Sequence, residues 1–297
     1  MLKRTLYFSK PARLSLRNLQ LVYTPKEGEG RSVPIEDLGF VVIEDQQISI
    51  SLPLLNALID NNVAVVFCNE KHMPASMLLN LDGHSVQTEL FAHQLAASEP
   101  LRKNLWKQTI VAKIINQAAL LHKLGFKAND LVLLASDVKS GDTSNREATA
   151  ARLYWGRLFG ADFIRDRYGT PPNMLLNYGY TILRAAIARG LSGSGLLATL
   201  GIHHHNRYNS FCLADDIMEP YRPFVDEHVY NIFRIKPDME EIGTGEKLQL
   251  MEVLTADVRI NKLMRPLMVA VSHTTASLSR CYALETKKIV YPSFAET

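Results

Sequence analysis

Residues 101–124, LRKNLWKQTIVAKIINQAALLHKL, place apolar side chains at every third or fourth position. That spacing gathers them on one face of a helix, so the stretch predicts a long amphipathic helix. The same period recurs in segments 90–97, 147–159, 174–188, 248–264 and 267–284. Together these segments predict a helical domain of roughly 200 residues, within the usual size range of domains.

The pattern before about residue 86 is different. Ala12–Tyr23 and Gln47–Ser51 alternate apolar and polar residues, while Phe40–Ile43 and Val63–Cys68 are short apolar runs. Both patterns are typical of strands. A short helix is expected at Pro53–Asn61, where leucines and an isoleucine share one face.

We therefore expect an α+β protein of two domains. Residues 1–85 form a small β-rich domain, and residues 86–297 form a larger all-α catalytic domain. The segment at residues 69–84, between the last strand and the first helix, carries turn signals and is expected to be irregular.

Composition excludes several classes of protein. Of the 297 residues, 47% are hydrophobic and 21% charged, as in ordinary soluble domains rather than disordered chains. Cys68, Cys212 and Cys281 are odd in number and far apart, which argues against a disulfide framework or a thiolate zinc site. The apolar runs are too short to span a bilayer. We expect a cytoplasmic protein with reduced thiols and no membrane association.

Charge is unevenly distributed although the net charge is only +3. Seven Lys/Arg face two Glu within residues 1–34, and eight Lys/Arg face four acids within residues 139–190. Residues 210–246 reverse the balance, with nine acids and three bases. Basic surface around an acidic centre suits an enzyme that holds phosphate backbones beside a metal. Solvated faces without a partner explain the charges equally well.

Three segments of the helical domain concentrate side chains that bind metals. They are Ser144–Glu147, Gly201–Asn206 with three consecutive histidines, and Asp215–Asp226 with four acidic residues. Hard divalent cations prefer carboxylate oxygens, and an added imidazole favours manganese. Only the tertiary fold can bring these segments together.

Each segment also has an ordinary interpretation. Ser144-x-x-Glu147 has the form of a capping box, in which the glutamate bonds to the start of its own helix. Adjacent histidines point in different directions, so one or two of the three at most could serve one ion. Asp216-x-x-Glu219 before Pro220 also resembles a helix start.

In combination, the segments resemble one family. The motifs that carry the resemblance are IEDLG (35–39), LPLL (52–55), VAVVFC (63–68), EATAAR (147–152), NYGYTILR (177–184), LGIHH (200–204) and DIMEPYRP (216–223). They are similar, in order and over nearly the whole chain, to the CRISPR adaptation integrases, the first of the CRISPR-associated proteins. GIHH and MEPYRP look most like the type II branch.

The resemblance implies a set of site residues. The family's metal ligands correspond to Glu147, His204 and Glu219, and these residues are the expected catalytic and Mg²⁺- or Mn²⁺-binding side chains. Asp216 matches an assisting acid of some relatives. His203 and His205 remain competing assignments for the histidine, and many relatives have aspartate where this chain has Glu219.

The implied reaction is a transesterification on DNA. The 3′-hydroxyl of incoming spacer DNA attacks a phosphodiester of the CRISPR repeat, with metal Lewis acidity stabilising the charge. The implied assembly is a homodimer formed through the β-rich domains, with two dimers bridged by a small companion protein into a heterohexamer. In type II systems the effector nuclease and a DNA-end-binding ring protein can also join.

Two other functions fit the same residues. A general metal-dependent nuclease acting on branched or repair DNA would use the same three ligands. A non-catalytic DNA-binding scaffold would use Glu147 only as a helix cap, and its loss would then cost on the order of 1 kcal/mol of stability.

Overall fold

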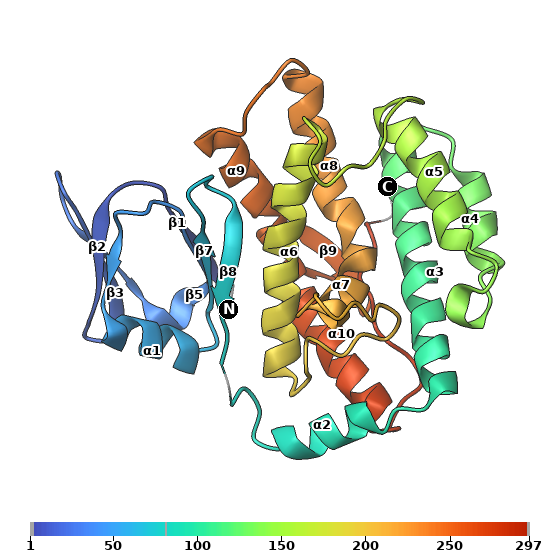
Figure 1. Cartoon of the computed structure of the whole chain (residues 1–297), viewed down its shortest axis with the longest axis horizontal. Coiled ribbons are helices and arrows are strands. Elements are labelled where there is room, and N and C mark those ends of the chain that lie inside the picture. The colour runs from blue at the N-terminus through green and yellow to red at the C-terminus, as the bar shows by residue number, and fades with distance from the viewer. Residues whose placement is uncertain (1–2, 81, 296–297) are drawn as a thin grey trace. The chain divides into compact units, whose positions relative to one another are not determined.

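The computed structural model describes residues 3–80 and 82–295 and divides the chain into two compact units, Met1–Gly83 and His84–Thr297. Figure 1 shows strands concentrated in the first unit and helices in the second. The expected mixed fold, with N-terminal strands and a helical C-terminal part, is confirmed. Within the described residues, no helix is both long and apolar enough to cross a membrane.

The first unit contains two four-stranded sheets with the orders β1-β5-β7-β8 and β4-β3-β2-β6. In the first sheet β5 pairs in parallel with β1 and β7, and β8 closes the sheet antiparallel to β7. In the second, β3 lies antiparallel between β2 and β4, and β6 is parallel to β2. The strands are β1 Arg4–Phe8, β2 Ala12–Arg17, β3 Gln20–Pro25, β4 Arg31–Pro34, β5 Leu38–Ile43, β6 Ser49–Ile50, β7 Ala64–Cys68 and β8 Pro74–Leu78, and the helices are η1 Ile35–Asp37 and α1 Leu52–Asp60.

One buried cluster joins both sheets and α1. Leu14 of β2, Val41 of β5, Val65 of β7 and Leu58 of α1 are all fully buried in it. β5 is buried along its whole length, which explains why its sequence is a continuous apolar run rather than an alternation. The α1 helix expected from the leucines of this segment is present.

Two expectations for this unit are wrong in detail. The alternating stretch Ala12–Tyr23 is not one strand but the hairpin β2–β3, with Asn18 and Leu19 at positive φ in the turn. Two consecutive residues of positive φ form the tight turns that match the twist of paired strands. The segment expected to be irregular contains β8, whose pairing with β7 depends on a partner strand that local patterning does not reveal.

The second unit is built on the helices α3, α6 and α10. In Figure 1, α7 and α8 lie between α3 and α6, and these helices contact both. The helices are α2 Gln87–Leu95, α3 Glu99–Lys123, α4 Asn129–Ser136, η2 Ser140–Asp142, α5 Arg146–Phe159, α6 Asn173–Gly193, α7 Cys212–Met218, η3 Glu219–Tyr221, α8 Arg222–Ile235, α9 Thr244–Met251, η4 Glu252–Thr255 and α10 Leu267–Tyr282.

The second unit was expected to be all-α, but it also contains two β-strands. The spacing in residues 248–264 predicts a helix, but α9 ends at Met251 and the strands β9 Asp257–Ile260 and β10 Leu263–Pro266 follow as a hairpin. Asn261 and Lys262 form its turn with positive φ. Apolar residues in so short a stretch fit either period, so the pairing of the two strands decides the structure.

Long helix α3 forms where the sequence predicts it and positions one wall of the candidate site. Ser98 caps its N-terminus by accepting a hydrogen bond from the Leu101 N–H at 3.4 Å. Its buried face includes Trp106, Ile110 and Ile114, which follow one another at a helical spacing of four residues. Lys113 lies on the same buried face.

Candidate metal and DNA-processing site

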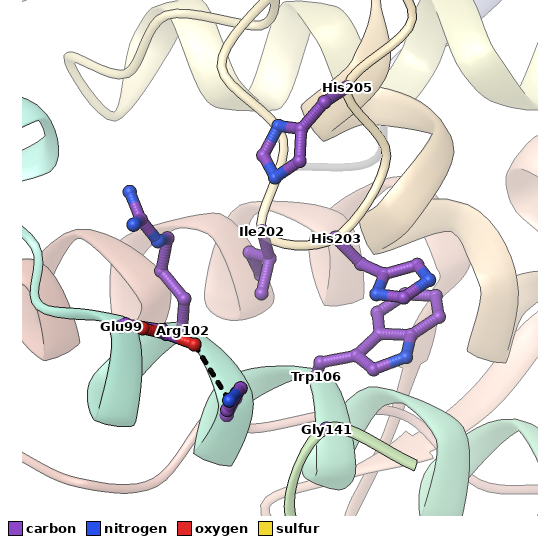
Figure 2. Close-up of a pocket in the computed structure, with 8 residues that line it drawn as sticks. Glu99, Arg102, Trp106, Gly141, Ile202, His203 and His205 are labelled. Atoms are coloured by element: carbon purple, nitrogen blue, oxygen red, sulfur yellow. Dashed lines mark ion pairs between the residues drawn. The ribbon is translucent and has the colours of Figure 1, made fainter. Parts of the chain in front are cut away.

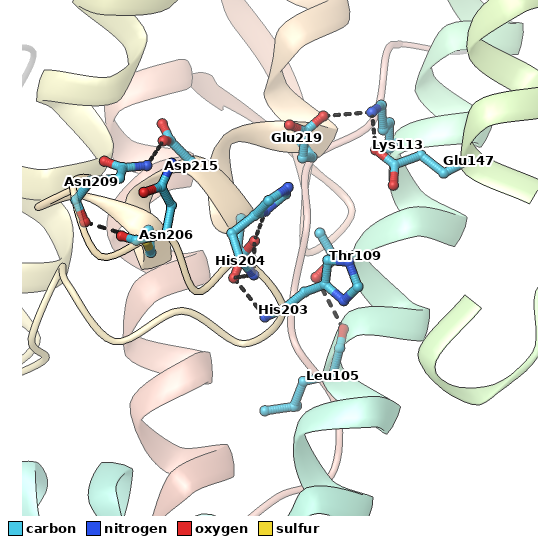
Figure 3. A network of polar contacts seen from close by, with 12 residues as sticks. Leu105, Thr109, Lys113, Glu147, His203, His204, Asn206, Asn209, Asp215 and Glu219 are labelled. Carbon is cyan, nitrogen blue, oxygen red and sulfur yellow. Dashed lines mark hydrogen bonds and ion pairs between the residues drawn. The ribbon is translucent and has the colours of Figure 1, made fainter. Parts of the chain in front are cut away.

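Lys113 links two of the three predicted ligands. Its Nζ lies 2.6 Å from Oε1 of Glu147 and 2.6 Å from Oε2 of Glu219. Arg222 contacts the other oxygen of Glu219 at 2.8 Å. We call these four side chains, Lys113, Glu147, Glu219 and Arg222, the Lys113 cluster; Figure 3 shows its central contacts. The fold therefore brings together two carboxylates that are far apart in the sequence.

Glu147 is held at the start of α5 without serving as its cap. Asp142 accepts hydrogen bonds from the backbone N–H groups of Arg146 and Glu147 at 2.9 and 3.0 Å. The N-cap residue Asn145 makes no side-chain cap bond, and the buried Ser144 Oγ has no hydrogen-bond partner in the described part of the chain. The capping-box interpretation is wrong, because Asp142 caps the helix and the Glu147 carboxylate bonds to Lys113.

Glu219 is ionised although it is buried. Its side chain is 6% exposed, compared with 26% for Glu147. Burial by itself raises the pKa of Glu219, but attraction to Arg222 and Lys113 outweighs burial and holds the pKa below its ordinary value. Glu219 opens η3 between α7 and α8, and Asp216 lies inside α7, so this segment is not the helix start that its sequence suggested.

His204 is oriented by Asp216. A hydrogen bond of 2.5 Å joins its Nδ1 to Oδ1 of the fully buried Asp216, which also accepts the His203 N–H at 2.9 Å. Gly201 permits this tight loop, because a Cβ there would lie 2.3 Å from the His204 carbonyl oxygen and 2.9 Å from Asp216 Oδ2. With Nδ1 engaged, Nε2 is the nitrogen available to a ligand.

The three histidines have different environments. The His203 ring stacks on the buried Trp106, with centroids 4.3 Å apart and planes 4° from parallel. Figure 2 shows this stack beside a cavity of about 390 Å³, which His205 and Arg102 also line. All three histidines are exposed, but His203 stacks on Trp106, whereas the His204 ring is bound to a buried carboxylate.

His204 is electrostatically coupled to the Lys113 cluster. Its hydrogen bond to Asp216 raises its pKa, and the charges of Glu219 and Glu147 raise it further. The structure thus places Glu147, His204 and Glu219 within one electrostatic environment. As they stand, however, no three His, Cys, Asp or Glu side chains among residues 3–80 and 82–295 are arranged to hold a metal ion.

The chemistry of the donor set fits a hard divalent cation. Two ionised oxygen donors and one imidazole are the types that Mg²⁺ and Mn²⁺ accept. The buried Glu219 Oε2 is paired with the Lys113 ammonium at 2.6 Å. The Lys113 ammonium occupies the space between the two carboxylates.

Sequence reasoning missed Lys113. The signal was present, because the period of α3 places residue 113 on the same face as Ile110 and Ile114. A lysine at such a position is almost never buried unless it is paired. Burial by itself lowers its pKa, but attraction to Glu219 and Glu147 outweighs burial and the pKa is raised. These two carboxylates therefore favour the charged form of Lys113.

Several arginines of the basic region 139–190 have acidic partners. Arg157 pairs with Asp130 at 2.6 Å, Arg184 pairs with Asp215 at 2.6 Å, and Arg146 pairs with Asp137. The charge count alone therefore overstates how many of these side chains are free to contact phosphates.

A second buried carboxylate lies in the same unit. Asp226 of α8 accepts hydrogen bonds from the hydroxyls of Tyr154 at 2.7 Å and Tyr180 at 2.5 Å. We call these three side chains the Asp226 pocket. Burial raises the pKa of Asp226 to about 7, against the lowering effect of the Tyr180 and Tyr154 hydrogen bonds.

Fold and site together define a two-unit α+β protein in which Glu147 and Glu219 meet at Lys113 of α3. Residues 6–241 match the family model described as CRISPR associated protein Cas1. The CRISPR-associated endonuclease Cas1 of Neisseria meningitidis serogroup C (strain 8013) is 38% identical over 261 residues, covering 87% of this chain and 85% of the relative. The chain belongs to the Cas1 family, which confirms the resemblance found in its motifs.

Solved structures share the fold. A casposase bound to integration product superposes with a TM-score of 0.78 at 19% identity, covering 97% of this chain and 92% of the other. A chain of a Cas6-RT-Cas1–Cas2 complex gives a TM-score of 0.74 at 18% identity, covering 99% of this chain and 36% of the longer one. At these identities the likeness concerns the fold.

Proposed function

We propose that this protein integrates new spacer DNA into a CRISPR array, by attack of a 3′-hydroxyl on a phosphodiester of the repeat. The observation that carries the proposal is the meeting of Glu147 and Glu219 at Lys113, beside His204, in a member of the Cas1 family. The structurally similar casposase is bound to an integration product, which supports joining rather than simple cleavage.

Glu147, His204 and Glu219 would hold Mg²⁺ or Mn²⁺, which supplies Lewis acidity to the scissile phosphate and the leaving oxygen. The chain's own residues prepare the site. Asp142 fixes the start of α5 so that Glu147 faces α3. Asp216 fixes the His204 ring through Nδ1 and is the assisting acid of this site. Arg222 keeps Glu219 ionised by pairing with it.

The proposed assembly follows the family. Two copies associate through the β-rich residues 1–85, and a small companion protein bridges two such dimers into a heterohexamer on double-stranded DNA. The similar chain of the Cas6-RT-Cas1–Cas2 complex supports a companion of the Cas2 kind. A type II effector nuclease and a DNA-end-binding ring protein are further proposed partners.

A joining assay tests the function. Purified protein and its companion are incubated with Mn²⁺, a short duplex bearing free 3′-hydroxyls and a supercoiled plasmid that carries the repeat. Joined duplex–plasmid products are expected. Nicked plasmid without joined duplex would instead identify a general nuclease acting on branched or repair DNA.

Glu147→Ala distinguishes the enzyme from a non-catalytic scaffold. The variant should fold and bind DNA but lose joining, because one of two carboxylate ligands is gone. Glu227→Ala is the matched control, since Glu227 also pairs with a lysine of α3, Lys123, at 2.6 Å, outside the Lys113 cluster. Undiminished joining by folded Glu147→Ala would remove Glu147 from the site.

A further inference from the structure

Lys113 occupies the position that a shared cation would need. Its Nζ is 2.6 Å from one oxygen of each carboxylate, and its side chain is only 11% exposed. The two oxygens therefore face the same point from α5 and from η3. One point cannot hold both an ammonium and a metal ion.

The lysine is carried by a rigid element. α3 runs for 25 residues, is capped by Ser98, and buries Ile110 and Ile114 on either side of Lys113. Moving the α3 backbone would disturb this buried packing, whereas the flexible stem of a lysine can move its charge by rotation.

In the metal-free protein, a cation between Glu147 and Glu219 is needed to offset the repulsion between the two carboxylates. Two ionised carboxylates brought together in a largely buried site repel each other, and an isolated buried charge is costly. Of these two carboxylates Arg222 pairs with Glu219, whereas Lys113 is the cation among the described residues that contacts both. It stabilises the arrangement of both ligands before any ion binds.

We infer that Lys113 is a built-in counter-ion, which holds Glu147 and Glu219 together in the metal-free protein and is displaced from between them when a divalent cation binds. This inference rests on the metal site of the proposed function. Lys113 acts through Glu147 and Glu219, so it is a positioning residue. The Lys113 ammonium competes directly with the metal ion for the same carboxylate oxygens of Glu147 and Glu219.

A purely structural ion pair predicts the opposite result. If Lys113 only braced the two carboxylates and stayed in place during metal binding, its removal would misplace the ligands and weaken metal binding. If it competes, its removal leaves an uncompensated negative site that binds the metal more tightly. The direction of the affinity change therefore separates the two roles.

The test measures Mn²⁺ binding by isothermal titration calorimetry, and unfolding temperature with and without Mn²⁺, on the full chain. Four proteins are compared: wild type, Lys113→Met, Glu147→Gln and Lys123→Met. Lys123→Met is the matched control, because it breaks the Lys123–Glu227 pair of the same helix outside the cluster. Glu147→Gln tests the metal site itself.

Lys113→Met should unfold at a lower temperature than wild type without metal, and should bind Mn²⁺ at least about tenfold more tightly, since a unit charge a few ångströms away affects affinity by more than that factor. Its unfolding temperature should therefore rise more on addition of Mn²⁺ than that of wild type. Lys123→Met should match wild type in Mn²⁺ affinity.

Unchanged or weaker Mn²⁺ binding by Lys113→Met, with Glu147→Gln abolishing binding, would overturn the counter-ion role and leave the metal site intact. Absence of binding in both wild type and Lys113→Met would overturn the metal site, and the inference with it. If methionine prevents folding, Lys113→Gln retains a hydrogen-bond donor for one carboxylate and must show the same tightening.

Discussion

The Lys113 cluster and the Asp226 pocket both bury carboxylates in the helical unit, but they neutralise them differently. Glu147 and Glu219 are balanced by the cations Lys113 and Arg222, and Glu147 is 26% exposed. Asp226 is 1% exposed and is met by two tyrosine hydroxyls, and its pKa is raised to about 7. In the first arrangement, cations contact the carboxylate oxygens directly. In the second, hydroxyl groups do, although the charges of Arg222 and Arg165 also act on Asp226.

This difference separates a candidate site from a structural polar core. We expect a metal ion to replace a cation that contacts a carboxylate directly, and not to replace the hydroxyl donors of Asp226. We expect changes in the Lys113 cluster to affect catalysis and changes in the Asp226 pocket to affect stability.

The largest expected effect is the loss of joining in His204→Ala. The variant removes the imidazole next to the cluster, and joining should fall by about 100-fold or more. His205→Ala should stay close to wild type, because His204 and not His205 is the histidine held by Asp216. The rate at which each variant forms joined product is measured at the same Mn²⁺ concentration and compared with that of wild type. Equal losses in the two variants would invalidate the choice of His204.

The next effect is on the pH dependence of stability. The pKa of Asp226 is raised to about 7 in the folded protein, above its unfolded value. The folded state therefore binds the proton more tightly, and stability due to this group is present at low pH and lost as pH rises toward 7. The slope is up to about 1.4 kcal/mol per pH unit.

Asp226→Asn should remove that slope. Denaturant unfolding of wild type and variant at about pH 5 and about pH 8 measures it. The variant should gain stability relative to wild type at the higher pH, while its joining activity stays near wild type. A stability difference that is the same at both pH values would show that Asp226 does not titrate in this range.

A smaller effect is expected for Tyr154→Phe. Loss of its hydroxyl leaves one oxygen of buried Asp226 without its donor, which should cost about 1–3 kcal/mol of unfolding free energy. Tyr208→Phe serves as control, because Tyr208 is 80% exposed and surface changes are usually within about 0.5 kcal/mol. Strand joining by folded Tyr154→Phe should be normal, and a specific loss of joining would move the Asp226 pocket into the site.

The smallest effect is expected for Lys123→Met. The Lys123–Glu227 pair has the same length as the pairs of Lys113, but the Lys123 side chain is 44% exposed. Exposed ion pairs contribute about 0–1 kcal/mol, so Lys123→Met should lower the free energy of unfolding by about 1 kcal/mol at most. A cost as large as that of Lys113→Met would show that burial does not distinguish the two lysines.

The sequence predicted α3, α5, α6 and α10 but not α4 or α7, and it missed several strands. The period of residues 101–124 marks α3 because helical neighbours are three and four residues apart, within one local stretch. Strand β8 and the β9–β10 hairpin were missed, since a strand is stabilised by its partner and not by its own residues. The motifs indicated the family and named Glu147, His204 and Glu219 as the expected ligands.

By itself, the sequence determined which residue types were available, where the long helix α3 runs, and which family the motifs resemble. Only the tertiary structure decided how they are used: Asp142 caps α5 in place of Ser144, Asp216 binds His204, and Lys113 stands between Glu147 and Glu219. The physical reason is that ion pairs and hydrogen bonds depend on distances in space, and residues remote in sequence become neighbours only when their helices pack.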